Sequence, residues 1–200
     1  MSPDGPQDEP ERGKADDPPA FPPFEVLATE RVYDSPWCAL DRDQIRLEDG
    51  TEGEYHIFRI PDAVVVVPVT EDGDIAMIWQ HRHPHGRSHW EVPAGRMNPG
   101  ETPAEAAHRE LAEETGHHAG ELVALPGFFP INGISDHFAH AFLALDCAPT
   151  GELDLDATER IVLRTRPLAE VRAALEGGEL ADGFSALALF QAFTHLDARA

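Results

Sequence analysis

Apolar and polar positions follow two different periods along this chain, one typical of strands and one typical of helices. Short runs rich in β-branched and aromatic residues predict strands, and two longer runs with apolar residues at helical spacing predict helices at 167–176 and 184–196. The predicted strands cover residues 63–69, 74–80, 90–93, 121–125, 138–145 and 160–166. The residues Thr-Glu-Asp-Gly between the first two strands favour a hairpin. This pattern predicts an α/β fold with a mixed sheet between helices, without an internal repeat or a second domain.

The chain upstream of residue 61 has a different character. The stretches 24–31 and 44–60 contain two or three candidate strands, which predicts a small N-terminal β subdomain over residues 25–60. Residues 1–24 are rich in proline and acidic residues and poor in apolar ones, which indicates a disordered tail and not a targeting peptide. We therefore expect a tail, the β subdomain and a core domain over 61–200.

A further helix is predicted by capping residues in the middle of the chain. Thr102 can cap a helix with its hydroxyl, Pro103 suits the first turn, and Glu105 completes a capping box three residues after the cap. Gly116 provides a natural C-terminal stop. The helix is therefore expected from Thr102 or Pro103 to Thr115, about four turns long.

Acidic side chains gather on one face of this helix. Glu110, Glu113 and Glu114 are three or four residues apart, so their carboxylates repel one another unless a cation is present. Mg²⁺ prefers oxygen ligands and keeps positions open for substrate phosphates, so this face predicts a Mg²⁺ site, with Mn²⁺ as an alternative. Arg109 is expected to point away from the metal face and to pair with Glu101 in the preceding loop. The alternative is an ordinary amphipathic helix whose glutamates face water.

The order of residues separates these alternatives, because the segment resembles the signature of the Nudix hydrolases, the Nudix box. The matching positions are Gly95, five residues, Glu101, seven residues, Arg109, Glu110, Leu111, one residue, Glu113, Glu114, one residue and Gly116. His117 stands where the family has an aliphatic residue that packs the helix end. The resemblance covers roughly residues 25–196 and implies an α/β/α sandwich.

Residues 90–95 (Trp-Glu-Val-Pro-Ala-Gly), together with Gln80 and Arg82, resemble the ADP-ribose and ADP-sugar pyrophosphatase branch of this family. The resemblance implies that the Ala94 carbonyl binds metal beside the Glu110 and Glu114 carboxylates. It also implies a homodimer formed through the N-terminal subdomain, and a compact monomer is the alternative.

The substrate loop departs from the branch at two positions. Asn132 stands in place of a proline, and His137 in place of a glutamate that is sometimes assigned as the catalytic base. Candidate bases are therefore His137, Asp136 and Glu159, the last of which is predicted to begin a strand.

Four other residues are candidates for binding substrate. Arg82 and Arg96 suit phosphate oxygens, although arginines near an acidic helix also form structural ion pairs. Trp37 and Phe24 could stack on an adenine, although aromatic residues are more often part of a core.

Composition excludes several classes of partner. The net charge is −22, so nucleic acid and anionic lipid are repelled, and nucleotides need a metal in order to bind. No apolar run approaches the roughly twenty residues that span a membrane, and we expect a cytoplasmic enzyme. Four histidines between residues 81 and 89 raise the alternative of a transition-metal site, but Pro84 and Gly86 indicate a solvated loop near the substrate entrance.

The predicted activity is hydrolysis of the pyrophosphate bond of a nucleoside diphosphate linked to another moiety. Two or three Mg²⁺ ions would be held by the Ala94 carbonyl, Glu110, Glu113 and Glu114. ADP-ribose, which would give AMP and ribose 5-phosphate, is the expected substrate. The alternatives are another Nudix substrate, such as a nucleotide sugar, NADH, a nucleoside triphosphate or a dinucleoside polyphosphate, and a sensor that binds ADP-ribose without cleaving it.

Overall fold

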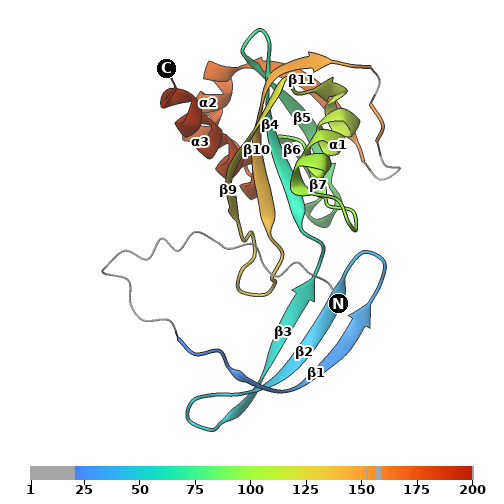
Figure 1. Cartoon of the computed structure of the whole chain (residues 1–200), viewed down its shortest axis with the longest axis vertical. Coiled ribbons are helices and arrows are strands. Elements are labelled where there is room, and N and C mark those ends of the chain that lie inside the picture. Colours follow the sequence, from blue (N-terminus) through green and yellow to red (C-terminus); the bar gives the residue numbers. More distant parts are fainter. Residues whose placement is uncertain (1–20, 152, 156–158, 200) are drawn as a thin grey trace.

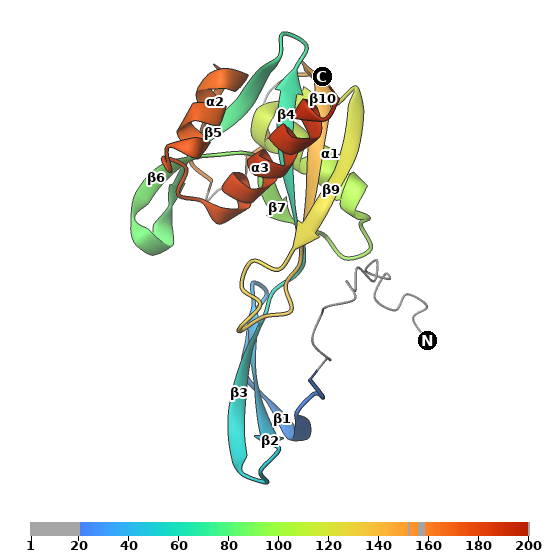
Figure 2. The ribbon, with the colours of Figure 1, turned by 90° about the vertical axis from the view of Figure 1, so that its left-hand side faces the viewer.

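The computed structural model describes residues 21–151, 153–155 and 159–199. It consists of a body with an α/β/α sandwich and an arm that projects from one end of the body (Figure 1; Figure 2). The tail predicted for residues 1–24 lies outside the described residues as far as residue 20.

The body is built on a mixed sheet of eight strands. Its main path runs β11-β5-β4-β10-β8, and β6, β7 and β9 pair with β5, β4 and β10. Strands β4 and β10 are parallel, whereas the other pairs are antiparallel. The strands are β4 (Ala63–Thr70), β5 (Asp74–Arg82), β6 (Arg87–Glu91), β7 (Ala94–Arg96), β8 (His117–His118), β9 (Glu121–Phe128), β10 (Ala139–Pro149) and β11 (Ile161–Pro167).

Helices cover both faces of this sheet. Helix α1 (Pro103–Thr115) lies on one face, and α2 (Leu168–Glu176) and α3 (Gly183–Asp197) lie on the other (Figure 1). The position of β4 between the two helix layers explains why its sequence is a nearly continuous run of valines. Val64 and Val66 pack with α1, whereas Val65 and Val67 pack with α2 and α3, so both faces of the strand are buried. The predicted sandwich is confirmed.

The arm is a three-stranded antiparallel sheet of β1 (Glu25–Asp34), β2 (Ala39–Arg46) and β3 (Glu52–Arg59). Most of β2 was not predicted from the sequence, because the inward positions of this strand include aspartates. Asp41 is buried between Arg31 and Arg59, which lower its pKa by hydrogen bonding, and Asp43 accepts a hydrogen bond of 2.6 Å from Thr29. A strand whose buried positions are filled by paired carboxylates lacks the apolar alternation that marks strands.

The arm and the body are connected by the loop between β9 and β10. The Phe58 N–H donates to the Ile134 carbonyl (2.7 Å), the Ser135 hydroxyl donates to the Phe58 carbonyl (2.6 Å), and the Tyr55 hydroxyl donates to the Gly133 carbonyl (2.7 Å). The predicted substrate loop is therefore bound to β3.

Two local predictions need correction. The histidine-rich segment contains an exposed turn, as predicted, but the turn is short, because β5 continues through Arg82, a 3-10 turn covers His83–His85, and β6 begins at Arg87. Gly86 takes a left-handed φ of 63° and closes this turn. Glu159 does not begin a strand, because β11 starts two residues later at Ile161.

Candidate active site

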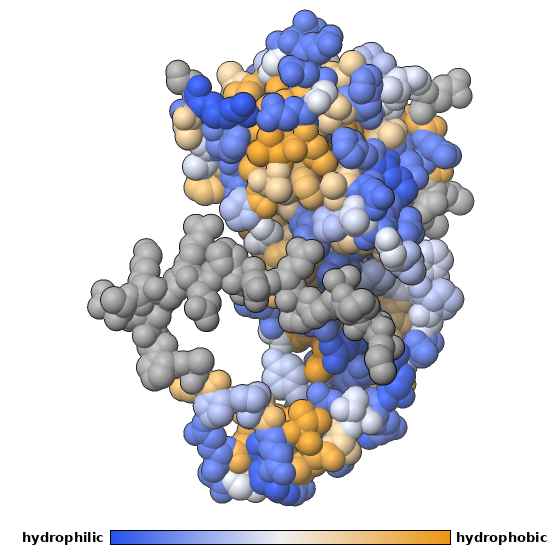
Figure 3. All heavy atoms as spheres, viewed as in Figure 1, coloured by the Kyte–Doolittle hydropathy of each residue, from blue (hydrophilic) through white to orange (hydrophobic). Residues whose placement is uncertain are grey.

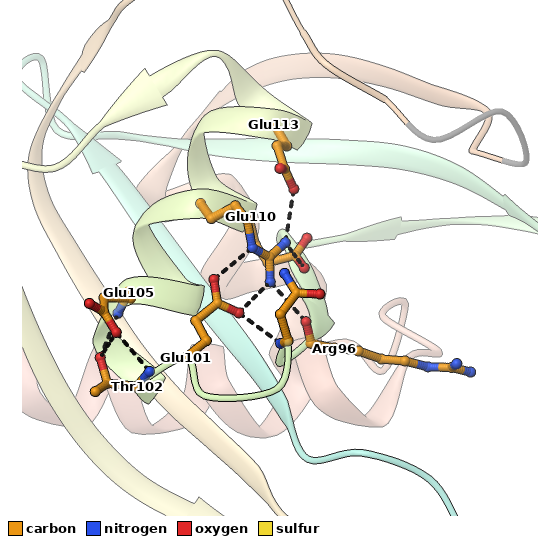
Figure 4. Close-up of polar contacts among 8 residues, drawn as sticks. Arg96, Glu101, Thr102, Glu105, Glu110 and Glu113 are labelled. Carbon is orange, nitrogen blue, oxygen red and sulfur yellow. Dashed lines mark hydrogen bonds and ion pairs between the residues drawn. The ribbon is translucent and has the colours of Figure 1, made fainter. Parts of the chain in front are cut away.

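Helix α1 is held in place by the caps that its sequence predicts. The Glu105 N–H donates to the Thr102 hydroxyl (3.3 Å), and the Glu105 carboxylate accepts from the Thr102 N–H (2.8 Å), so the capping box is complete (Figure 4). At the other end Gly116 adopts a φ of 65° and donates its N–H to the Ala112 carbonyl. These caps fix the direction in which the acidic face points.

Arg109 lies at the centre of this acidic face. Its guanidinium donates two hydrogen bonds to Glu101 (2.8 and 2.9 Å), one to Glu110 (2.7 Å) and one to Glu113 (2.9 Å), as the dashed lines in Figure 4 show. A further bond of 2.8 Å reaches the Arg96 carbonyl. The predicted pair with Glu101 is present, but the prediction that Arg109 points away from the metal face was wrong. The planar guanidinium has five N–H donors and is long enough to serve the loop and the helix face together.

The pKa values of the acidic residues are shifted in different directions. Hydrogen bonds from Arg109 lower the pKa of Glu101 to about 2. Burial raises the pKa of Glu110 and raises that of Glu114 to about 8, and the negative charge of Glu159 contributes to both shifts. A group of carboxylates whose pKa values are raised in this way favours a bound cation, because a cation stabilises their ionised forms.

Strand β7 brings backbone atoms against the same carboxylates. The Glu114 carboxylate accepts a hydrogen bond of 2.9 Å from the Ala94 N–H. A Cβ atom at Gly95 would lie 2.0 Å from a carboxylate oxygen of Glu110, so only glycine leaves room for this carboxylate. The glycine at the start of the box is therefore explained by the close approach of β7 to α1.

The oxygen donors fit a hard divalent cation in kind. Glu110, Glu113 and Glu114 offer carboxylates, and the Ala94 carbonyl lies on the neighbouring strand. Among the residues that the structure describes, however, no three His, Cys, Asp or Glu side chains converge at metal-binding distances. Arg109 and the Ala94 N–H each occupy one acceptor site of these carboxylates in this conformation, and their other oxygen lone pairs are available to a cation.

A cavity of about 710 Å³ opens in front of the acidic face. Its walls include most of the predicted site residues, namely Trp37, Arg82, Ala94, Arg96, Arg109, Glu110, Glu113 and Glu159. Trp37 comes from the arm and is 70% exposed, and its carbonyl accepts a hydrogen bond of 2.9 Å from Arg96. The turn between β1 and β2 therefore forms part of the wall of this cavity.

The remaining predicted residues, which include Glu101 and the buried Glu114, are not part of the described wall of this cavity. His137 is buried with its Nδ1 atom 2.7 Å from the Pro61 carbonyl, and its ring lies near Phe184. Asp136 pairs with Arg59 of the arm. Neither residue, nor Asn132, is part of the described wall of the cavity, whereas Glu159 is.

Arg82, a predicted substrate-binding residue, has a partner that the sequence did not indicate. Glu91 is buried and accepts three hydrogen bonds of 2.6 to 3.2 Å from Arg82, which fixes one edge of the guanidinium. This pair depends on the register of β5 and β6, for which the sequence carries no direct signal. The wall also includes Asn98, Asp154 and Leu155, which were not predicted, and Gln80, His81, His83 and Pro84, in agreement with the prediction that the histidine-rich segment lies near the substrate entrance.

Comparisons with known proteins agree with this fold and site. The family model described as NUDIX domain matches residues 59–185, and the model of the nucleoside diphosphate sugar hydrolase N-terminal domain matches residues 24–58. The chain therefore belongs to the Nudix hydrolase family. It is a Nudix pyrophosphohydrolase that resembles ADP-ribose pyrophosphatases, as the box predicted.

Its relatives include ADP-ribose pyrophosphatases of two bacteria. The Bacillus subtilis protein is 32% identical over 165 residues, which cover 82% of this chain and 89% of the relative. The Mycobacterium tuberculosis protein is 30% identical over 164 residues, which cover 81% of this chain and 79% of the relative. A CMP-5'-(N-acetyl-N-hydroxy-3-aminopropyl)phosphonate hydrolase of Streptomyces rubellomurinus is 31% identical over 158 residues, which cover 79% of this chain and 76% of the relative.

The solved structures supply a match for the fold. A crystal structure of an ADP compounds hydrolase superposes with a TM-score of 0.80, covers 92% of this chain and 99% of its own, and is 24% identical in sequence. In the described part of the chain, none of the helices combines the length and apolar character needed to cross a membrane.

Proposed function

We propose that this protein hydrolyses ADP-ribose to AMP and ribose 5-phosphate in a reaction that requires Mg²⁺. The observation that carries the proposal is a single cavity that combines the Glu110 and Glu113 carboxylates, three arginines and an exposed tryptophan from the arm. The acidic face suits a metal-bound diphosphate, and the exposed Trp37 ring suits an adenine. The two bacterial ADP-ribose pyrophosphatases among the relatives support this choice of substrate.

Each group has a proposed task. Glu110, Glu113, Glu114 and the Ala94 carbonyl would hold Mg²⁺, which neutralises phosphate charge and lowers the pKa of bound water. Arg82 and Arg96 bind phosphate oxygens. We assign Glu159 as the acceptor of the water proton in preference to His137 and Asp136, because Glu159 is the one of the three that lines the cavity.

The reaction is a displacement at phosphorus. The water oxygen forms a bond to one phosphorus atom, and the bond from that phosphorus to the bridging oxygen breaks. The bridging oxygen leaves with the second phosphate, and one water proton goes to Glu159.

A different nucleotide substrate is the second candidate. The relative from Streptomyces rubellomurinus is named for a CMP-linked phosphonate, and the loop with Asn132 and His137 departs from the ADP-ribose branch. Nucleic acid is not expected as a partner, and a cytoplasmic location is our proposal from the acidic composition.

Metal dependence and the bond that is broken can be tested together. Metal-free protein is incubated with ADP-ribose plus Mg²⁺, Mn²⁺ or EDTA, and the products are separated by chromatography. The expected result is equal amounts of AMP and ribose 5-phosphate with Mg²⁺ and none with EDTA. Hydrolysis at full rate in EDTA, or release of adenosine or free phosphate as first products, would reject the proposal.

We also propose that the arm forms a homodimer interface. Large apolar side chains on the arm are exposed, including Val26, Val32, Tyr33 and Tyr55, and Figure 3 shows apolar atoms gathered on it. Several exposed large apolar side chains on one small subdomain are typical of an interaction site. Light scattering after gel filtration should give twice the chain mass of 21.9 kDa.

Substitution on the arm provides the test of this interface. Val26→Lys combined with Val32→Lys should shift the mass to that of the monomer. The matched control is Val162→Lys, which changes a similarly exposed valine on β11 in the body and should leave the dimer intact. A monomeric wild-type protein would show that the interface does not exist.

A further inference from the structure

The side-chain oxygen of Gln80 is buried in the wall of the active-site cavity and has no hydrogen-bond partner in the described part of the chain. Gln80 is 4% exposed, and its Oε1 atom has no partner among the described residues. An unpaired buried polar group destabilises the folded state. A methionine would fill similar space without this cost. The amide is therefore a candidate for contact with a ligand.

The strand register places Gln80 beside the proposed proton acceptor. Gln80 pairs with Ile161 on β11, two residues after Glu159, and the His81 N–H donates to the Arg160 carbonyl (3.3 Å). Side chains alternate along β5, so Gln80 shares its face with Ile78 and Arg82. Gln80 and Glu159 line the same cavity as Glu110 and Glu113.

The chemistry of an amide favours water over phosphate as the group it contacts. Arg82 and Arg96 line the same cavity, and a charged guanidinium binds phosphate oxygens more strongly than a neutral amide does. Water that attacks phosphorus must direct a lone pair at that atom while its protons are accepted elsewhere. A carboxylate can take one proton, and an amide oxygen can accept a hydrogen bond from the other. Rotation of the amide about χ3 exchanges its oxygen and nitrogen, so Gln80 can present its acceptor to the cavity.

We propose that Gln80 is a positioning residue for the attacking water, acting beside Glu159. This inference rests on the proposed hydrolysis and adds the group that fixes the direction of attack. Gln80 accepts a hydrogen bond from the water proton that is not transferred, while the other proton goes to Glu159. The water oxygen then bonds to phosphorus as the bond to the bridging oxygen breaks.

The test compares Gln80→Met with a matched control, Gln191→Met. Gln191 on α3 also has an unpartnered Oε1 atom among the described residues, but it does not belong to the cavity wall. With ADP-ribose and Mg²⁺, Gln80→Met should lower kcat at least tenfold and leave KM within about twofold. Gln191→Met should leave both constants unchanged. The melting temperature of metal-free protein should not fall in either variant, because each loses an unpaired polar group.

Reaction in ¹⁸O-labelled water gives a readout that a structural role would not change. The wild type should place ¹⁸O in one of the two products, and Gln80→Met should distribute it between both because the direction of attack is less fixed. Gln80→Asn keeps the amide but withdraws it by one methylene, so it should also lower kcat, and it replaces Gln80→Met if that variant fails to fold.

Three outcomes would overturn the inference while the wild type is active. These are an unchanged kcat in Gln80→Met and Gln80→Asn, a rise in KM alone, or an unchanged ¹⁸O distribution in a slowed variant. A wild-type protein that fails to hydrolyse ADP-ribose contradicts the proposed function instead. If that protein hydrolyses another nucleoside diphosphate derivative, the same comparison with that substrate decides the role of Gln80.

Discussion

Glu114→Gln should remove most of the hydrolytic activity while leaving the fold intact. Glu114 is almost fully buried and is anchored by the Ala94 N–H, so the amide can occupy the same space. The amide is a weaker ligand for a divalent cation and carries no charge to offset one. We expect a loss in kcat/KM of about a hundredfold or more, in line with other losses of charge stabilisation in active sites. Glu176→Gln, which changes an exposed glutamate on α2, should keep wild-type activity.

The same variant should change how the stability of the metal-free protein depends on pH. Burial raises the pKa of Glu114 to about 8 from an ordinary value of 4.5, so the folded state holds this proton more tightly than the unfolded state does. The contribution of Glu114 to the free energy of unfolding is fully present below pH 4.5. It is lost as the pH rises to about 8, at up to roughly 1.4 kcal/mol per pH unit. Glutamine does not titrate, so this loss should be absent in Glu114→Gln.

Thermal melts of metal-free protein between pH 5 and 9 provide the measurement. The variant should become more stable than the wild type as pH rises, and saturating Mg²⁺ should stabilise the wild type alone. Equal pH dependence in both proteins, or an active Glu114→Gln enzyme, would show that Glu114 is not the buried metal-binding carboxylate.

Gly95→Ala should be the second most damaging single substitution. The added Cβ would lie 2.0 to 2.3 Å from the three atoms of the Glu110 carboxylate group, so that group must move. It is the flexible end of a side chain, and the fold should therefore survive while the ligand position is lost. We expect a loss of activity of about 10- to 100-fold and weaker binding of Mg²⁺.

The matched control for this substitution is Gly183→Ala, where a Cβ would meet no atom within 4 Å. Activity should be unchanged there, and stability should rise by roughly 0.4–1 kcal/mol through the unfolded state. Calorimetric titration with Mg²⁺ and steady-state kinetics separate the two variants. Wild-type metal affinity in Gly95→Ala would contradict the close approach of β7 to Glu110.

Local sequence signals predicted the elements around the site. The capping box and Gly116 predicted α1 because its caps depend on neighbouring residues, and Gly73 predicted the hairpin of β4 and β5. Long-range pairing was not predictable in this way. Strand β2 is stabilised by ion pairs with β1 and β3, and Glu91 finds Arg82 only through the register of β5 and β6.

Other predictions about the site differ from the structure because they depend on how far a side chain reaches or on where a loop is held. Helical spacing placed Arg109 away from Glu110, but the flexible side chain bends back to contact it. His137 and Asp136 were candidate bases because of their place in the chain, yet the hydrogen bonds between their loop and β3 direct that loop to the arm. His117, the departure from the box, is buried with its Nδ1 atom 2.7 Å from the Thr115 carbonyl, so a polar residue is accommodated at the helix end.

The proposed preference for ADP-ribose is tested most directly by comparing kcat/KM among nucleotide substrates. Purified protein with Mg²⁺ is offered ADP-ribose, ADP-glucose, NADH, GDP-mannose and ATP, and kcat/KM is determined for each from the products separated by chromatography. The proposal predicts the highest kcat/KM for ADP-ribose, with AMP and ribose 5-phosphate formed in equal amounts. A higher value for any other compound, or binding of ADP-ribose without turnover, would contradict it.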